Sequence, residues 1–312
     1  MKPVHLFASM LLGLGGCGEE PALRNAPAAA EPAKRAEFQR VVVFGDSLVD
    51  AGNVHLATGG RYAAEAKGFV AGRFTNGFTF ADRIAMGVEG RVTVPTRKGG
   101  NNYAHGGAKA MPDDDGIPDA QFQVEGWLAG REGEPEPTTL FILTFGGNDL
   151  RHPRRGSGSA EAYHQAVAQS YAGAVRTLFT YGARNVLITG APLLNGAGES
   201  LQRQLDKELG GIELREGQRL LRYDFLPFWR SLLADAPRLG FRPWTAKAAA
   251  TASMAGAERI SGDDCVGDRR QAGGCAGYVL FDRVHPTAAV HALIARDMAA
   301  KLGIPIADPP AR

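Results

Sequence analysis

A serine lies directly after a short apolar run near the start of the chain, where it could act as a nucleophile. The run Val41-Val42-Val43-Phe44 is followed by Gly45-Asp46-Ser47. Four consecutive apolar residues, three of them β-branched, predict a strand buried on both faces, as in a parallel sheet covered by helices. Ser47 then lies just past the carboxyl end of the strand, where the ligand crevices of open α/β sheets form. The alternative is that Ser47 caps the following helix, a common role of serine.

A nucleophilic serine requires a general base, and the base requires a group that holds its tautomer. Of the seven histidines, His285 is the strongest candidate because Asp282 lies three residues before it, in a predicted turn ahead of the last helix. An Asp at this spacing often arises by chance, so the pairing gains weight only from other groups expected at the same edge of the sheet. His164 and His291 fall in predicted amphipathic helices, where a surface histidine is expected.

Acyl transfer also requires hydrogen-bond donors for the oxyanion of the tetrahedral intermediate. The backbone N–H groups of Ser47 and Gly107 and the side-chain amide of Asn148 are three candidates, all expected at the carboxyl edge of the sheet. Each of the last two has a plainer alternative, because paired glycines are typical of tight turns and Asn148 could cap a helix or close a turn. Asp149 is expected to cap the following segment rather than to take part in catalysis.

Four blocks of the chain resemble the motifs of the GDSL, or SGNH, hydrolase family, in the order of that family. The first block is Phe44 to Ser47 with Asp50 and Asn53, and the second, the glycine block, is Asn102 to Ala108. The third, the asparagine block, is Gly146 to Asp149, and the fourth is Asp282 to Pro286. The resemblance implies a flavodoxin-like α/β/α sandwich that hydrolyses carboxylic esters, from short acyl esters to lipids and phospholipids, without a cofactor. It implies that Ser47 is the nucleophile, His285 the base and Asp282 its orienting partner, and it favours Gly107 over Gly106 as the oxyanion donor.

A further segment, Arg73-Phe74-Thr75-Asn76-Gly77, is similar to one found in the subgroup of plant and secreted bacterial lipases. Two features depart from the family pattern, namely the aromatic residues Phe78 and Phe80 after this segment and the basic run from Arg151 to Arg155. Both are expected to bear on the substrate. The basic run could meet phospholipid head groups, and the alternative is a solvated loop.

The elements that position these residues follow from the apolar runs. Runs near residues 41, 92–104, 140, 185 and 220 predict strands, with helical patterns between them. Alternating strands and helices predict a three-layer α/β/α sandwich with a mostly parallel, five-stranded sheet. Residues 39–303 are predicted to form a single domain, in which 240–282 is an elaborated loop, and 304–312 a C-terminal tail.

The first seventeen residues resemble a bacterial lipoprotein signal peptide. A positive start, Met1-Lys2, precedes an apolar stretch that closes in Leu14-Gly15-Gly16-Cys17. This pattern predicts that Cys17 is lipidated, so that the protein contacts a membrane of the bacterial cell envelope through its anchor. An ordinary secretory signal is the alternative. Residues 18–38 are rich in Ala, Pro and charge, which predicts a flexible tether.

Two cysteines, Cys265 and Cys275, remain after the signal peptide. In an oxidising envelope their spacing suggests a disulfide, because no His or further Cys lies at the spacing that a metal site requires. The formal net charge of +2 and the scattered Lys and Arg residues give no sign of a nucleic-acid partner.

The sequence thus predicts a serine esterase or lipase for small-molecule or lipid esters. Two alternatives are an acyltransferase with the same acyl-enzyme and a catalytically idle lipoprotein that binds ligands in the envelope. The idle reading is disfavoured because every member of the catalytic constellation is present.

Overall fold

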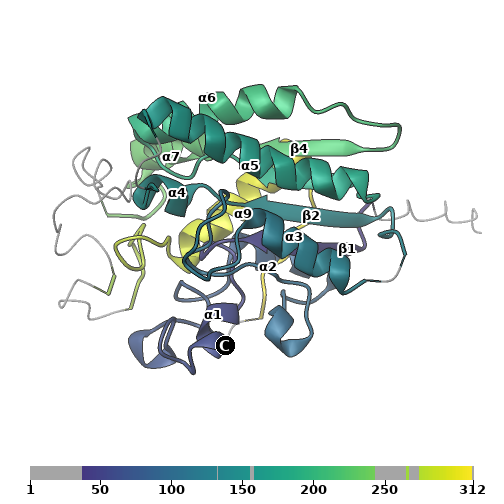
Figure 1. Ribbon diagram of the computed structural model, residues 1–312. Coiled ribbons are helices and arrows are strands. Elements are labelled where there is room, and N and C mark those ends of the chain that lie inside the picture. Colours follow the sequence, from purple (N-terminus) through teal and green to yellow (C-terminus); the bar gives the residue numbers. More distant parts are fainter. Residues whose placement is uncertain (1–36, 132, 155–157, 243–264, 267–273, 311–312) are drawn as a thin grey trace, which may run out of the picture. The chain divides into compact units, whose positions relative to one another are not determined.

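The computed structural model describes residues 37–131, 133–154, 158–242, 265–266 and 274–310 (Figure 1). The predicted signal peptide, the lipidation site Cys17 and residues 18–36 of the predicted tether lie outside this part. So does much of the predicted loop 240–282.

Four parallel strands form the sheet in the described part of the chain, and they lie side by side in the order β1-β2-β3-β4. Their bounds are β1 Arg40–Gly45, β2 Thr139–Thr144, β3 Asn185–Thr189 and β4 Arg219–Tyr223. Every residue of β2 and β3 is buried, as expected for central strands whose two faces are both covered. The predicted α/β class with a parallel sheet is confirmed.

The prediction of a strand within residues 92–104 is wrong. This segment forms only isolated bridges, such as that between Val43 and Asn102. The segment does follow the free edge of β1, where the Val43 N–H donates to the Asn101 carbonyl and the Tyr103 N–H to the Val43 carbonyl. At Val41, however, the backbone groups bond to side chains and not to the backbone of a neighbouring strand. Its carbonyl accepts from the Asn101 amide at 2.8 Å, and its N–H donates to Glu89 at 2.6 Å. The described sheet therefore has four strands, not five.

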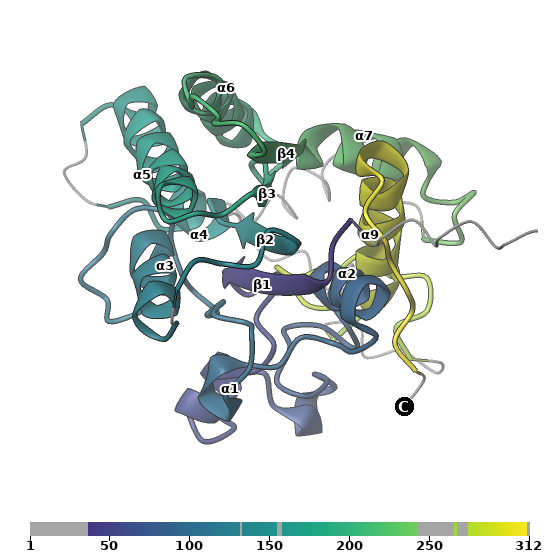
Figure 2. The ribbon, with the colours of Figure 1, turned by 90° about the vertical axis from the view of Figure 1, so that its right-hand side faces the viewer.

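Helices cover both faces of the sheet (Figure 2). One layer contains α2 (Phe80–Glu89), α7 (Phe225–Asp235) and α9 (Ala288–Leu302). The other contains α3 (Ala120–Ala129), α5 (Ala160–Thr180) and α6 (Gly196–Gly210). The remaining described helical elements are short: α1 (Asn53–Ala57), α4 (Gly147–Arg151) and the 3-10 turns η1 (Glu65–Lys67) and η2 (Thr96–Lys98). Among the described residues, no helix has both the length and the apolar character needed to cross a membrane.

The hydrophobic core is divided by the sheet into two clusters. Leu140 and Ile142 of β2 pack toward α2, α7 and α9, whereas Phe141 and Leu143 pack toward α3, α5 and α6. This is the two-residue alternation of a strand, with both faces apolar. The carboxyl ends of the strands are thereby held rigidly, and the polar residues that follow them are displayed at one edge.

The segment after α9 returns along α2. Ile304 is buried, and the Ala307 N–H donates to the Arg83 carbonyl at 3.0 Å. A side chain at Gly87 would come within 2.5 Å of the Ile306 backbone, so this glycine permits the close approach. Residues 304–307 are thus tied to the domain by packing and by a hydrogen bond.

Candidate active site

Ser47 lies in a tight turn directly after β1. The Asp46 N–H donates to the Thr144 carbonyl at 3.1 Å, and the Asp46 carboxylate accepts the Leu48 N–H at 2.9 Å. The side-chain amide of Gln123 pairs with both the N–H and the carbonyl of Gly45, at 2.8 and 2.9 Å. Helix α1 begins only at Asn53, with Gly52 at its N-cap. Ser47 therefore does not cap α1. The turn places Ser47 beyond the last residue of β1.

His285 joins Ser47 to Asp282. Its Nε2 lies 2.7 Å from the Ser47 Oγ, and its Nδ1 lies 2.8 Å from the Asp282 Oδ2. Asp282 Oδ1 also accepts the backbone N–H groups of Val284 and His285, at 2.8 and 2.7 Å. Burial favours the neutral form of Asp282, but the attraction of His285 and these hydrogen bonds outweigh it, so the pKa of Asp282 lies below its usual value. The carboxylate thus remains ionised beside the imidazole.

The three predicted oxyanion donors lie on segments that meet near the turn. In the described part of the chain, the N–H groups of Ser47 and Gly107 have no protein acceptor, whereas the Gly106 N–H donates to Asp50 at 3.0 Å. This difference favours Gly107 over Gly106 as a donor to a ligand. The Asn148 amide donates to the Ala108 carbonyl at 2.9 Å, which leaves its second N–H for another acceptor.

Comparison with known proteins identifies the family of the domain. The family model for GDSL-like lipases and acylhydrolases matches residues 41–298. The chain belongs to this family.

Relatives in the GDSL group include three bacterial proteins. The chain is 30% identical to Lipase 1 of Photorhabdus luminescens over 62% of its own length and 26% of the lipase. It is 26% identical to the thermolabile hemolysin of Vibrio parahaemolyticus, over 84% of the chain and 63% of that protein. It is 23% identical to the phosphatidylcholine-sterol acyltransferase of Aeromonas hydrophila, over 85% of the chain and 90% of that protein. The chain therefore spans less than two thirds of the first two relatives.

Asp50 and Asn53 of the first GDSL block organise the glycine block. Asp50 accepts four backbone N–H groups, those of Gly52, Asn53, Val54 and Gly106. Burial raises the pKa of Asp50 against the opposing effect of these donors. Asn53 donates to the carbonyls of Asn102 and Ala104 at 2.8 and 2.9 Å. Sequence reasoning found both residues as motif members and did not find this bracing role.

Asp149 of the GDSL asparagine block bonds to the segment that directly follows the glycine block. It accepts the N–H groups of Ala110 and Met111 at 2.9 and 3.0 Å, so the expectation that it caps the segment after it is wrong. Burial raises the pKa of Asp149 to about 6. Burial also raises the pKa of Asp46 to about 7, and the charge of Asp149 adds to that effect. Two buried carboxyl groups with raised pKa values thus lie close to Ser47 in the chain or the fold, and one of them, Asp46, directly precedes it.

Histidines outside the GDSL motifs also differ from expectation. His291 is fully buried, and the Phe80 N–H donates to its Nδ1 at 3.3 Å. Burial lowers the pKa of His291 to about 3, which keeps this ring neutral. His164 is buried as well. Neither is the surface histidine that helical amphipathicity predicts.

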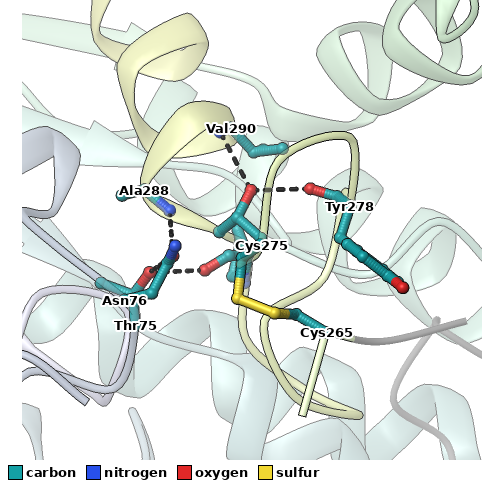
Figure 3. The surroundings of a disulfide bond; sticks show 9 residues. Thr75, Asn76, Cys265, Cys275, Tyr278, Ala288 and Val290 are labelled. Atoms are coloured by element: carbon teal, nitrogen blue, oxygen red, sulfur yellow. Dashed lines mark hydrogen bonds between the residues drawn. A yellow bond between two sulfur atoms is a disulfide. The ribbon is translucent and has the colours of Figure 1, made fainter. Parts of the chain in front are cut away.

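The predicted cysteine pair lies at disulfide distance in the GDSL domain. Cys265 and Cys275 have Cα atoms 5.2 Å apart, and their sulfur atoms are bonded (Figure 3). They pack with Tyr278, Phe281 and Phe69 in a small cluster. The Cys265 N–H donates to the Leu280 carbonyl and the Val266 N–H to the Phe281 carbonyl, at 3.0 and 2.9 Å. The bridge is therefore attached directly to the segment that leads into Asp282.

Two further residues of the GDSL domain lie close to the triad. The Phe74 ring centroid is 5.1 Å from that of His285. Burial lowers the pKa of the half-buried Arg151, while Asp282 and Asp46 oppose this, so its charge lies within electrostatic reach of both carboxyl groups. Among the described residues, no group of three or more His, Cys, Asp or Glu side chains is arranged to hold a metal ion.

Proposed function

We propose that this GDSL protein hydrolyses carboxylic esters, with Ser47 as nucleophile, His285 as general base and Asp282 as its orienting partner. The observation that carries the proposal is the position of one imidazole, 2.7 Å from a serine Oγ and 2.8 Å from a carboxylate oxygen. This is the hydrogen-bonded chain that activates a serine at neutral pH.

The proposed reaction has two halves. Ser47 Oγ attacks the acyl carbonyl while His285 Nε2 takes its proton, and Asp282 stabilises the imidazolium that results. The oxyanion receives hydrogen bonds from the N–H groups of Ser47 and Gly107 and from the Asn148 amide. The imidazolium then protonates the departing alcohol, which leaves an acyl group on Ser47. In the second half water attacks this ester by the same route and restores the free serine.

A serine-to-alanine variant tests this activity. Ser47→Ala is expected to abolish release of p-nitrophenol from a p-nitrophenyl acyl ester, since removing a triad member costs orders of magnitude in kcat. Ser231→Ala, which removes an exposed serine on α7, is the matched control and should retain wild-type turnover. Turnover by Ser47→Ala at the wild-type rate would refute the proposal.

A second candidate function is transfer of the acyl group to an alcohol other than water. It is favoured by the similarity to the Aeromonas hydrophila phosphatidylcholine-sterol acyltransferase, of which the match covers 90%. Analysis of the products formed with an added alcohol separates the two, because a transferase yields a new ester and a hydrolase yields free acid. A panel of acyl chain lengths and lysophospholipids then defines the substrate.

We also propose that Cys17 is lipidated and that the anchor holds the enzyme at a membrane of the cell envelope. The support is the apolar stretch that ends in Leu14-Gly15-Gly16-Cys17. Metabolic labelling with an alkyne fatty acid should mark the wild type and leave Cys17→Ala unlabelled. Equal labelling of both would contradict the anchor.

A further inference from the structure

The loop that carries His285 is held by a segment more than two hundred residues earlier in the chain. This segment, Arg73 to Gly77, is the one that resembles a subgroup motif, and the proposed reaction assigns it no task. Two of its side chains bond to the backbone just after His285. Thr75 Oγ1 donates to the Pro286 carbonyl at 2.8 Å, and Asn76 Oδ1 accepts the Ala288 N–H at 2.8 Å.

The bond from Asn76 satisfies a group that helix α9 cannot satisfy by itself. Ala288 is the first residue of α9, and the first N–H groups of a helix have no acceptor within the helix. The side chain of the N-cap residue Thr287 accepts the Val290 N–H at 3.4 Å and donates to the Tyr278 carbonyl at 2.9 Å, so it does not serve the Ala288 N–H. Figure 3 shows Asn76 directed at Ala288, with Thr75 beside it. The backbone on both sides of Thr287 is thus fixed from outside.

Phe74 occupies the space between the base and the glycine block. Its ring centroid lies 5.1 Å from that of His285, with the planes inclined by 37°. A Cβ at Gly106 would lie 2.5 Å from the same ring. Phe74 therefore packs close to both the imidazole and the loop that carries the proposed donor Gly107.

The segment is itself rigidly anchored. Arg73 forms two hydrogen bonds of 2.7 Å with Asp82, and both side chains are buried. Asp82 in turn forms a capping box with Thr79 at the start of α2. A Cβ at Gly77 would lie 2.6 Å from that of Ala288, so the absence of a side chain allows the close contact with α9. Because residues 73–77 are held in place in this way, they can restrict the movement of the His285 loop that they contact.

We propose that Phe74, Thr75 and Asn76 are positioning residues for the general base, which hold His285 Nε2 on the Ser47 Oγ. The inference rests on the proposed esterase function. None of the three reacts, and each acts through the backbone or ring of the His285 loop. Their loss leaves the triad chemically complete but lets the imidazole move away from the nucleophile, and a displacement of about 1 Å is enough to cost about 100-fold in rate.

The experiment compares pairs of variants at the two hydrogen-bonding positions. Thr75→Val and Asn76→Ala remove the bonds, whereas Thr75→Ser keeps a hydroxyl donor and Asn76→Asp keeps an acceptor oxygen. We expect kcat for a p-nitrophenyl ester to fall by about 10- to 100-fold in the first two, with KM within about two-fold of the wild type. The conservative variants should return kcat to within about three-fold of the wild type.

Controls remove comparable bonds elsewhere. Thr177→Val deletes a hydroxyl that bonds the Gly173 carbonyl within α5, and Asn185→Ala deletes an amide that bonds the Pro137 carbonyl at the amino end of β3. Both should keep kcat near the wild type. Wild-type kcat in Thr75→Val and Asn76→Ala would overturn the inference, and so would an equal loss in the controls or no recovery in the conservative variants.

A second measurement separates this inference from the proposed function. The proton shared by His285 Nδ1 and Asp282 is expected to give a downfield NMR resonance that Asn185→Ala retains and Asn76→Ala broadens or loses. If the wild type does not hydrolyse esters, the proposed function fails while this comparison still reports on positioning. An unchanged resonance in Asn76→Ala would overturn the inference even in an active enzyme.

Discussion

The backbone N–H of Gly106 donates to an Asp50 carboxylate oxygen at 3.0 Å, while the next N–H along the chain, that of Gly107, has no acceptor in the described part of the protein. Gly107 has a φ of 91°, a conformation that residues with side chains rarely adopt. The bond from Gly106 thus fixes the His105–Gly106 peptide, which is next to the peptide that carries the Gly107 N–H. Asp50 thereby holds the residue next to Gly107, the proposed oxyanion donor.

The role of Asp50 leads to a first prediction. Asp50→Ala leaves four backbone N–H groups without their acceptor, so we expect kcat for ester hydrolysis to fall by about 100-fold or more. Steady-state kinetics measures the loss, and circular dichroism establishes whether the variant is folded. A folded Asp50→Ala with wild-type kcat would show that the glycine block does not depend on this carboxylate.

Asn148 provides the second prediction. Asn148→Ala removes one proposed oxyanion donor, so we expect kcat to fall by about 100- to 1000-fold with little change in KM. Asn148→Asp keeps the size of the side chain but donates no N–H, and should be as inactive. High kcat in Asn148→Asp would mean that the amide is not a donor to the transition state.

The third prediction concerns stability and pH. The pKa values of Asp46 and Asp149, about 7 and about 6, exceed the ordinary 3.8, so between about pH 4 and 7 these two carboxyl groups bind more protons in the folded protein than in the unfolded chain. Their contribution to the free energy of unfolding should therefore decrease as the pH rises through this window, whereas the contribution of His291, whose pKa burial lowers to about 3, increases. Asp46→Asn removes one of the two groups and should weaken that decrease.

Urea unfolding of the wild type and Asp46→Asn at about pH 4.5 and 7.5 measures this slope. Relative to the wild type, the variant should gain stability at the higher pH. Identical slopes in the two proteins would mean that Asp46 titrates at its ordinary pKa in the folded state.

The disulfide is the subject of the fourth prediction. Closing a loop between cysteines ten positions apart contributes about 3 kcal/mol in the chain-entropy model, so Cys265→Ala with Cys275→Ala should lower the free energy of unfolding by about that amount. Because residues 265 and 266 bond to residues 280 and 281, next to Asp282, kcat should also fall. Unchanged unfolding and activity in the double variant would show that the bridge does not support the Asp282 loop.

Much of the site could be predicted from the sequence because parallel strands end at one edge of a sheet. The apolar runs before Ser47 and Asn148 predicted two buried strands, which the structure shows to be neighbours, and the spacing of Asp282 and His285 predicted one shared loop. These are local patterns. The structure brings the four residues to one edge, and the 2.7 Å contact between Ser47 and His285 spans 238 residues of the chain.

Contacts that depend on a single side chain reaching a distant backbone could not be predicted. The strand expected within 92–104 fails because the Asn101 amide takes the Val41 carbonyl, which a hydrophobic pattern does not indicate. Asp149 bonds to the N–H groups of residues 110 and 111, about forty positions earlier. In the same way, nothing in the local sequence around Thr75 and Asn76 points to the start of α9.

Covalent labelling tests the central claim most directly. A fluorophosphonate reacts with a serine only where a base activates the hydroxyl, and mass spectrometry of the digested protein locates the adduct. The account predicts one adduct on Ser47 of the wild type, which is strongly reduced in His285→Ala. An adduct on another serine, or equal labelling of Ser47 without His285, would contradict it.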